Sequence, residues 1–289
     1  MAAETELAPK SAPAKVNLYL HLRGRRADGY HLLDSLAVFP AIGDRLTAAA
    51  ARGLSLEIGG PFGRELSAEP DNLVLRAARA LAEAHGLEPN AALQLEKRLP
   101  VASGIGGGSS DAAATLRLLS RLWGVAIPDG LALTLGADVP VCMTAPQARL
   151  MAGVGEQLSP APPMPEFWIV LANPQVAVAT GAVFAAVESR ENPPDPPPPP
   201  KLTSFETLTG WLSRQRNDLQ PSAVSVCPLI AEVLAALRDA PLARMSGSGA
   251  TCFALHANEE GAVAQAKSLR RARPDWWVMA APVGITPAR

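Results

Sequence analysis

A glycine-rich stretch at residues 101–110, VASGIGGGSS, constrains the fold of this chain more than any other segment. Four of the five residues at 104–108 are glycine, which excludes regular structure there, whereas residues 110–123 repeat apolar side chains at helical spacing. The pattern predicts a loop that opens a helix, and inward-turned N–H groups at a helix start can hold phosphate. The expected phosphate-binding residues are Gly104, Gly106, Gly107, Gly108, Ser109 and Ser110. A flexible loop that merely caps the helix with serine is the alternative.

The composition limits the partners of the chain. Its 289 residues are 48% hydrophobic and 18% charged, which allows a sizeable core in one large domain or, as we expect, two moderate ones. A formal net charge of -1 gives no reason to expect nucleic acid or an anionic membrane as a partner, so we expect a small-molecule substrate. The N-terminal residues lack the apolar stretch of a signal peptide, and no other run is long enough to cross a membrane. We therefore expect a cytoplasmic protein, in which Cys142, Cys227 and Cys252 are free thiols.

Alternating and helical patterns predict an α+β chain. Residues 14–22 alternate as a half-buried strand, and residues 31–39 return as its hairpin partner. One face of the first strand is expected to carry Lys15, Asn17, Tyr19 and His21. A proline-rich stretch near 160–166 marks a domain boundary, and the prolines at 192–200 predict an exposed loop. Further strands are predicted at 91–100, 147–153, 167–174, 251–255 and 276–280, and helices at 72–85, 110–123, 129–135, 203–214, 228–238 and 258–271.

Three segments together carry a resemblance to a known family. They are PAKVNLYL at 13–20, LPVASGIGGGSSDAA at 99–113 and RMSGSGATCFAL at 244–255, and in this order they resemble the small-molecule kinases that phosphorylate galactose, homoserine, mevalonate and phosphomevalonate. The resemblance implies ATP and Mg²⁺ as cofactors. It also implies a ribosomal-protein-S5-like ATP-binding domain at 1–160, a ferredoxin-like domain at 161–289, and an active site in the cleft between them.

The resemblance assigns the transfer chemistry to Lys15 and Asp138. Phosphoryl transfer needs charge neutralisation around the γ-phosphate and a group that orients the attacking hydroxyl and accepts its proton. Because the transition state is loose, positioning and electrostatics contribute most, and the proton leaves late. Taken alone, Lys15 is typical of a solvated strand lysine and Asp138 of a turn or helix cap, so only the joint pattern supports these roles.

One member of the family, whose acceptor carries a cytidylyl group, is resembled more closely through RADGYH at 26–31, LGADVPV at 135–141 and AGVGE at 152–156. This implies phosphorylation of the 2-hydroxyl of that acceptor. A tyrosine ring offers a stacking face for cytosine, and an imidazole can pair with its polar edge. The acceptor-binding residues implied by the resemblance are Asn17, Tyr30, His31, Thr180 and Phe184, and Lys97 would lie on the adenine side.

Several features depart from the family pattern or stay open. Ala102, Ser103, Ile105 and Asp111 replace more familiar residues, and Asp111 is expected to point outward, away from the phosphates. The metal ligands stay unknown, with Ser109 as a candidate, and Asn217 and Asp218 carry no assigned role. Another kinase of the family and a catalytically silent ligand-binding relative are the alternatives; the cytidine-site residues and the pair of Lys15 and Asp138 argue against them. The chain is expected to be a monomer or a weak homodimer.

Overall fold

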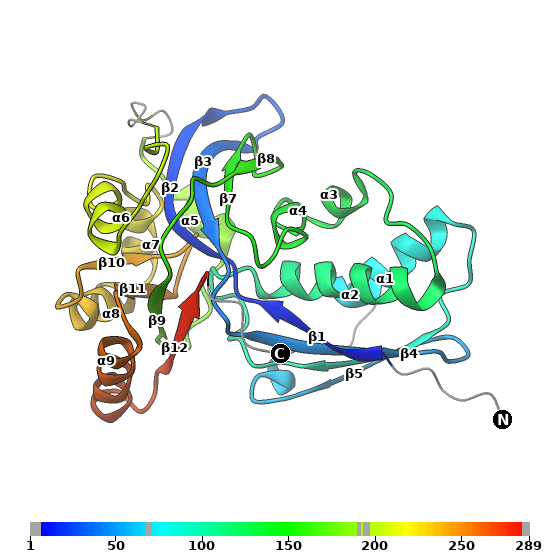
Figure 1. Cartoon of the computed structure of the whole chain (residues 1–289). Helices are drawn as coiled ribbons and strands as arrows, with labels where there is room; N and C mark the ends of the chain where they lie inside the picture. Colours follow the sequence, from blue (N-terminus) through cyan, green and yellow to red (C-terminus); the bar gives the residue numbers. More distant parts are fainter. Residues whose placement is uncertain (1–6, 67–70, 190–191, 193–196, 285–289) are drawn as a thin grey trace. The chain divides into compact units, whose positions relative to one another are not determined.

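The computed structural model describes residues 7–66, 71–189, 192 and 197–284. By its contacts the chain forms two compact units, each built from several segments (Figure 1). Unit 1 comprises Met1–Ala14, Gly43–Val101 and Gly106–Met143, and unit 2 comprises Lys15–Ile42, Ala102–Ile105 and Thr144–Arg289. The predicted domains, 1–160 and 161–289, are continuous in the sequence, whereas each unit combines several segments. The predicted boundary therefore stays a prediction.

Unit 1 is a four-stranded sheet with helices packed on it. The strand order is β1-β4-β6-β5, antiparallel except for the parallel pair β5 and β6. Helix α2 packs on β1 and β4, while α1 packs on β5 and on α2. The strands are β1 (Leu7–Pro13), β4 (Gly43–Ala49), β5 (Leu54–Gly59) and β6 (Ala91–Glu96), and the helices are η1 (Gly63–Glu65), α1 (Leu73–Ala84), α2 (Gly107–Trp123), α3 (Leu131–Leu135) and α4 (Val139–Cys142).

The helix ends of unit 1 follow from their capping residues. Asn72, at the start of the helix predicted at 72–85, caps α1, because its side chain accepts a hydrogen bond from Val74 N. Helix α2 begins at Gly107, three residues before the predicted start, and left-handed Gly124 ends it. The strand predicted at 91–100 ends at Glu96, because the backbone of Arg98 and Leu99 donates to the Asp44 carboxylate instead of to a neighbouring strand.

The first sheet of unit 2 contains the predicted hairpin. Its order is β2-β3-β7-β8, and all neighbours are antiparallel. The strands are β2 (Val16–Arg25), β3 (His31–Val38), β7 (Arg149–Ala152) and β8 (Gln157–Pro160). The prediction of one shared face on β2 is wrong, because the register with β3 shifts between Asn17 and Tyr19. This bulge puts Lys15 and Asn17 on the face of Ser35, whereas the Tyr19 hydroxyl reaches Asp34 on the opposite face.

The second sheet of unit 2 confirms the ferredoxin-like prediction. Four antiparallel strands lie in the order β10-β11-β9-β12, with helices between β9 and β10 and between β11 and β12. The strands are β9 (Phe167–Asn173), β10 (Leu242–Met245), β11 (Cys252–His256) and β12 (Trp277–Val283). The helices are α5 (Thr180–Ala185), α6 (Phe205–Leu212), α7 (Gln220–Val226), α8 (Leu229–Leu237) and α9 (Glu259–Ala272), of which α5 and α7 were not predicted. Residues 192 and 197–200 of the proline tract lie outside helices and strands, and 193–196 lie outside the described residues.

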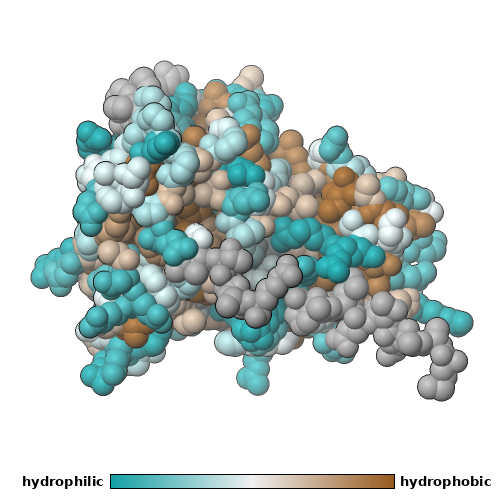
Figure 2. Space-filling model, viewed as in Figure 1, coloured by the Kyte–Doolittle hydropathy of each residue, from teal (hydrophilic) through white to brown (hydrophobic). Residues whose placement is uncertain are grey.

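The surface is largely polar (Figure 2), and the three cysteines belong to the core. Figure 2 shows polar residues over much of the visible surface and apolar residues gathered around α3, in which Leu133 is 41% exposed. Cys142, Cys227 and Cys252 are buried free thiols, as predicted. Within the described part of the chain, no helix has the length and apolar character needed to span a membrane.

Candidate active site

A chain of hydrogen bonds in unit 2 fixes the side chain of Lys15. The Ser35 hydroxyl donates to Tyr19 O at 2.6 Å and accepts from Asn17 Nδ2 at 2.7 Å. The Asn17 amide is therefore oriented with Oδ1 toward Lys15 Nζ, which donates to it at 2.9 Å. All three side chains are buried, so the ammonium of Lys15 is held in one place rather than solvated as a typical strand lysine would be.

The three segments that carry the resemblance meet within unit 2. Lys15 N donates to Ile105 O at 2.8 Å, which ties the glycine stretch to the start of β2. The Ser246 hydroxyl donates to Gly104 O at 3.1 Å and accepts from Asn17 N at 3.2 Å. Hydrogen bonds therefore join three segments into one assembly: the strand of Lys15, the glycine stretch, and residues 246–249, here called the SGSG segment.

Gly104 is required at its position by both conformation and space. Its φ of +74° lies in the left-handed region, and a Cβ there would meet Gly249 O at 2.5 Å and Ser246 O at 2.8 Å. The same approach is seen from the other side, since a Cβ on Gly247 would meet Gly104 O at 2.7 Å. The close backbone packing explains the glycines of both segments.

Of the predicted acceptor-binding residues, His31 and Phe184 contact each other in unit 2, and Thr180 contacts a residue that was not predicted, Ser248. The His31 and Phe184 rings stack with centroids 4.7 Å apart and an interplanar angle of 28°. The Thr180 and Ser248 hydroxyls are hydrogen-bonded at 2.9 Å. Tyr30 stands beside His31 at the start of β3, and its 61% exposure leaves a ring face open for stacking.

In unit 1 the first turn of α2 presents the predicted phosphate-binding groups. The helical hydrogen bonds begin with Ser110 N donating to Gly106 O, so the N–H groups of residues 107–109 precede the ladder. Gly106 is the N-cap with a φ of +63° and supplies no capping side chain. The Ser110 hydroxyl is buried and has no hydrogen-bond partner among the described residues, and Ser109 is half-buried. This arrangement can receive an anion.

A buried ion cluster lies directly beside this turn. Lys97 Nζ donates to Asp44 Oδ2 at 2.5 Å and to Asp111 Oδ2 at 2.8 Å, and all three side chains are at most 3% exposed. Asp111 therefore points inward, and the expectation that it points outward is wrong, because Lys97 compensates its buried charge. Burial raises the pKa of the Asp111 carboxyl to about 7, against the opposing effect of the Lys97 ammonium. Burial lowers the pKa of Lys97, but the two carboxylates outweigh it and the net direction is upward.

Asp138 and Lys15 belong to different units, so their partnership stays a prediction. Asp138 is half-buried and occupies the N-cap position of α4, yet its side chain makes no capping hydrogen bond. The helix-cap alternative raised by the sequence is therefore not supported. The adenine-side role of Lys97 also stays a prediction, and its ammonium is already engaged by Asp44 and Asp111.

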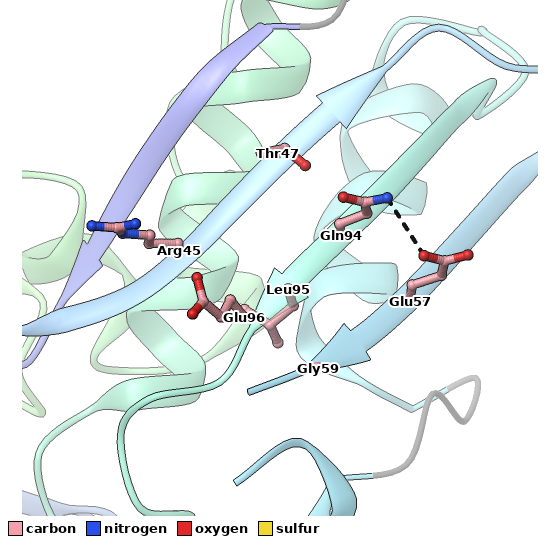
Figure 3. A pocket seen from close by; sticks show the side chains of 7 residues that line it. All are labelled: Arg45, Thr47, Glu57, Gly59, Gln94, Leu95 and Glu96. Atoms are coloured by element: carbon pink, nitrogen blue, oxygen red, sulfur yellow. Dashed lines mark hydrogen bonds between the residues drawn. The ribbon is translucent and has the colours of Figure 1, made fainter. Parts of the chain in front are cut away.

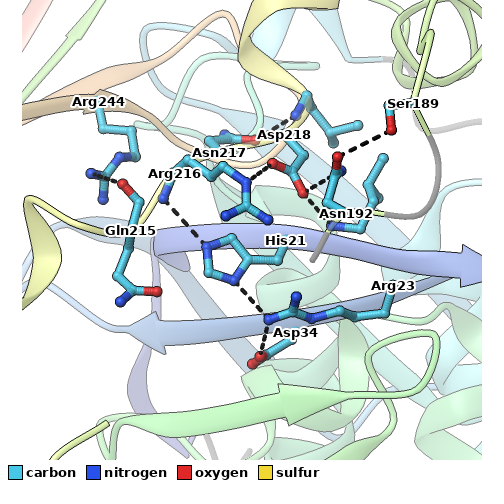
Figure 4. A network of polar contacts seen from close by, with 12 residues as sticks. His21, Arg23, Asp34, Ser189, Asn192, Gln215, Arg216, Asn217, Asp218 and Arg244 are labelled. Carbon is cyan, nitrogen blue, oxygen red and sulfur yellow. Dashed lines mark hydrogen bonds and ion pairs between the residues drawn. The ribbon is translucent and has the colours of Figure 1, made fainter. Parts of the chain in front are cut away.

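The structure gives Asn217 and Asp218 a clear structural role in unit 2 (Figure 4). Asn217 Nδ2 donates to Met245 O at 2.9 Å and to Gly247 O at 2.8 Å, while its Oδ1 accepts from Leu219 N. The Asp218 carboxylate accepts from Leu22 N at 2.7 Å, so this segment lies along β2. Asn217 thereby connects β2 to the SGSG segment.

Arg244 anchors the same region. Its buried guanidinium donates to three backbone carbonyls, and burial lowers its pKa to about 10. The acceptors, at 2.7–2.8 Å, are the carbonyls of Leu18, Leu212 and Gln215. The arginine remains charged at neutral pH and satisfies the carbonyl at the β2 bulge, that of Leu18, together with the carbonyls of Leu212 and Gln215.

A cavity of about 340 Å³ in unit 1 holds none of the predicted site residues (Figure 3). It lies on β4, β5 and β6 and is lined by Arg45, Thr47, Glu57, Gly59, Gln94, Leu95 and Glu96. Arg45 alternates with the buried Asp44 along β4, so the two side chains face opposite sides of the sheet. In the described ranges, no group of three or more His, Cys, Asp or Glu side chains could hold a metal ion.

Sequence reasoning missed several polar residues that position the site. The strand pattern at 31–39 assigns no role to Ser35, and the segment at 244–255 carries the resemblance without a role for its serines. Their roles depend on contacts with residues distant in the chain, which no local pattern reveals. The acidic residue after the two serines of the glycine stretch was a visible signal, but its partner Asp44 lies 67 positions earlier. The residues missed are Ser35, Asp44, Asp111, Ser246 and Ser248.

Comparisons with known proteins agree with this geometry. Family models described as GHMP kinases N terminal domain and GHMP kinases C terminal match residues 72–145 and 201–275. The chain is 56% identical over 271 residues to the 4-diphosphocytidyl-2-C-methyl-D-erythritol kinase of Ruegeria pomeroyi, which covers 92% of this chain and 95% of the relative. A crystal structure of 4-(cytidine 5'-diphospho)-2C-methyl-D-erythritol kinase is similar at 35% identity with a TM-score of 0.78, over 96% of this chain and 100% of that one. Homoserine kinase from Cytophaga hutchinsonii shares the fold, with 17% identity and a TM-score of 0.67 over 98% of each chain.

Proposed function

Because the chain belongs to the GHMP kinase family, we propose that it transfers the γ-phosphoryl group of ATP to the 2-hydroxyl of 4-diphosphocytidyl-2-C-methyl-D-erythritol. This step belongs to the non-mevalonate route to isoprenoid precursors. The observation that carries the proposal is the assembly in unit 2, where hydrogen bonds join Lys15, Asn17, Gly104 and Ser246. The match to the Ruegeria pomeroyi kinase over nearly the whole chain supports the choice of acceptor.

In this proposal Lys15 and Asp138 act on the reacting groups. Asp138 orients the 2-hydroxyl and accepts its proton late in the transfer, since a carboxylate is too weak a base to remove an alcohol proton beforehand. The ammonium of Lys15, held by Asn17 Oδ1 at 2.9 Å, stabilises the charge that develops on the transferred group. Accurate placement matters because the hydroxyl is tertiary and hindered.

The phosphates of ATP would lie on the first turn of α2, where the N–H groups of 107–109 and the hydroxyls of Ser109 and Ser110 are available. Mg²⁺ would accompany ATP, with Ser109 as the candidate protein ligand. Magnesium usually keeps several waters and is bound through phosphate oxygens and few protein groups. It would neutralise phosphate charge during transfer.

The cytidylyl group of the acceptor would be bound by Tyr30, His31 and Phe184, with Thr180 and Asn17 nearby in unit 2. Stacked aromatic rings and an imidazole suit a pyrimidine base.

The protein would act in the cytoplasm on small molecules alone, as a monomer or weak homodimer. Size-exclusion chromatography with light scattering across protein concentrations tests the last point.

A coupled assay of ADP release tests the acceptor. The protein is given ATP with 4-diphosphocytidyl-2-C-methyl-D-erythritol, homoserine or mevalonate in parallel. We expect ADP release with the cytidylyl acceptor and background rates with the other two. Release with homoserine or mevalonate instead would assign the chain to another reaction of the family, and no release with any acceptor would favour a ligand-binding protein.

A further inference from the structure

The ion cluster of Lys97, Asp44 and Asp111 joins three segments of unit 1 at the start of the phosphate-binding helix. Asp44 lies at the beginning of β4, Lys97 directly follows β6, and Asp111 lies in the first turns of α2. In the sequence, Lys97 is 53 residues from Asp44 and 14 residues from Asp111. One buried ammonium thus sets the distance between the sheet and the helix start.

The cluster also touches the phosphate-binding turn itself. A Cβ on Gly107, the first residue of α2, would stand 3.0 Å from Lys97 Nζ and 3.7 Å from Asp44 Oδ2. The backbone of Gly107 therefore packs directly against the charged groups. Asp44 Oδ1 further accepts from the N–H groups of Arg98 and Leu99, at 2.6 and 2.8 Å, so the carboxylate also holds the backbone that leads into the glycine stretch.

The charge of the cluster matters because ATP brings several negative charges to the same turn. Two carboxylates share one ammonium, and without Lys97 two buried acids would lie close together beside the first turn of α2 with no cation between them. In a site of low dielectric constant, the charges of the cluster and of bound phosphates would interact much more strongly than in water. The cation is therefore needed for geometry and for electrostatics alike.

We propose that Lys97 is a positioning residue for ATP: through its ion pairs with Asp44 and Asp111 it holds the first turn of α2 in its phosphate-binding form and keeps two buried carboxylates from repelling the phosphates. The inference rests on the proposed ATP-dependent transfer. It assigns to the Lys97 side chain a role within the protein and gives Asp44 and Asp111 a function in nucleotide binding.

Lys97→Met tests the proposal, because methionine has a similar length without the charge. The KM for ATP is expected to rise by at least about tenfold while the KM for the cytidylyl acceptor changes by less than about threefold. Adding Asp111→Asn to Lys97→Met removes one uncompensated carboxylate and should bring the KM for ATP back to within about threefold of the parent. Leu116→Ala, a cavity variant in the same helix, controls for simple loss of stability.

The outcomes separate the alternatives. If both KM values rise together, or if Asp111→Asn gives no rescue in a folded double variant, the positioning role is wrong. If Lys97→Met does not fold, Asp111→Asn and Asp111→Leu give the same test, because only asparagine keeps an acceptor for Lys97. Asp111→Leu should raise the KM for ATP by at least about fivefold, whereas Asp111→Asn should leave it near that of the parent. Equal KM values for ATP in the two variants would overturn the proposal. An inactive parent protein would refute the proposed function instead.

Discussion

Asn17 illustrates how much of the candidate site is fixed by single residues. Its amide donates to Ser35 Oγ and accepts from Lys15 Nζ, at 2.7 and 2.9 Å. The second N–H of the amide contacts Met151 Sδ at 3.9 Å, so one lone pair of Oδ1 remains for the acceptor that Asn17 is proposed to bind. The residue can orient Lys15 and contact the substrate together, so replacing it would disturb two functions. Asp138 and Tyr30, each with one proposed role, give clearer tests than Asn17.

Asp138→Asn tests the proposed proton acceptor at the residue scale. The amide keeps the size of the side chain but cannot accept the proton, so turnover should fall by at least about a hundredfold, the scale of lost acid–base catalysis. ATP affinity, measured by calorimetry, should stay near that of the parent. Near-normal turnover would refute the role of Asp138.

Tyr30→Ala tests the cytidine site. The ring is 61% exposed, so its loss should leave the fold intact. Stacking of a base on an aromatic ring is worth about 1–3 kcal/mol, which corresponds to a rise in the KM for the cytidylyl acceptor of about 5- to 150-fold. Tyr30→Phe keeps the ring and is the matched control, with a KM near that of the parent. A selective loss of ATP affinity in the alanine variant would contradict the assignment.

At the scale of elements, the site depends on segments that do not form regular structure. The Arg216–Asp218 segment pairs with Leu20 along β2, and Asn217 holds the SGSG segment that packs on Gly104. Local patterns could predict most of the strands and helices, including the hairpin of β2 and β3. They could not predict the bulge after Asn17, because both faces of β2 are buried and the alternation of apolar residues does not distinguish the registers. Nor could they predict the hydrogen bonds of Asn217, because these join distant segments.

Asn217→Ala tests this link. Two backbone carbonyls, of Met245 and Gly247, would lose their buried donor, and each unsatisfied group costs about 1–3 kcal/mol. The free energy of unfolding, from urea denaturation, should fall by about 2–6 kcal/mol. Asn192→Ala is the control, because the Asn192 amide donates to Asp218 Oδ2 and accepts from Ser189 Oγ rather than satisfying buried backbone carbonyls, and its loss should cost about 1 kcal/mol or less. Equal losses for the two variants would remove the special role of Asn217.

For the whole molecule, the fold class expected from the sequence is confirmed. The α+β architecture and the ferredoxin-like sheet agree with the solved structure that is 35% identical, with a TM-score of 0.78. The glycine stretch alone indicated phosphate binding, and the structure adds that its Gly104 belongs with Lys15 and Ser246. Lys97 shows the limit of such reasoning, because its buried partners Asp44 and Asp111 follow from the fold and from no motif.

The most direct test of the account is the position of the phosphate in the product. The protein is incubated with ATP and 4-diphosphocytidyl-2-C-methyl-D-erythritol, and the product is examined by ³¹P NMR with correlation to carbon. We predict one new phosphomonoester resonance that correlates with the tertiary carbon bearing the 2-hydroxyl. Phosphate on a different hydroxyl, or ADP formed without any phosphorylated acceptor, would contradict it.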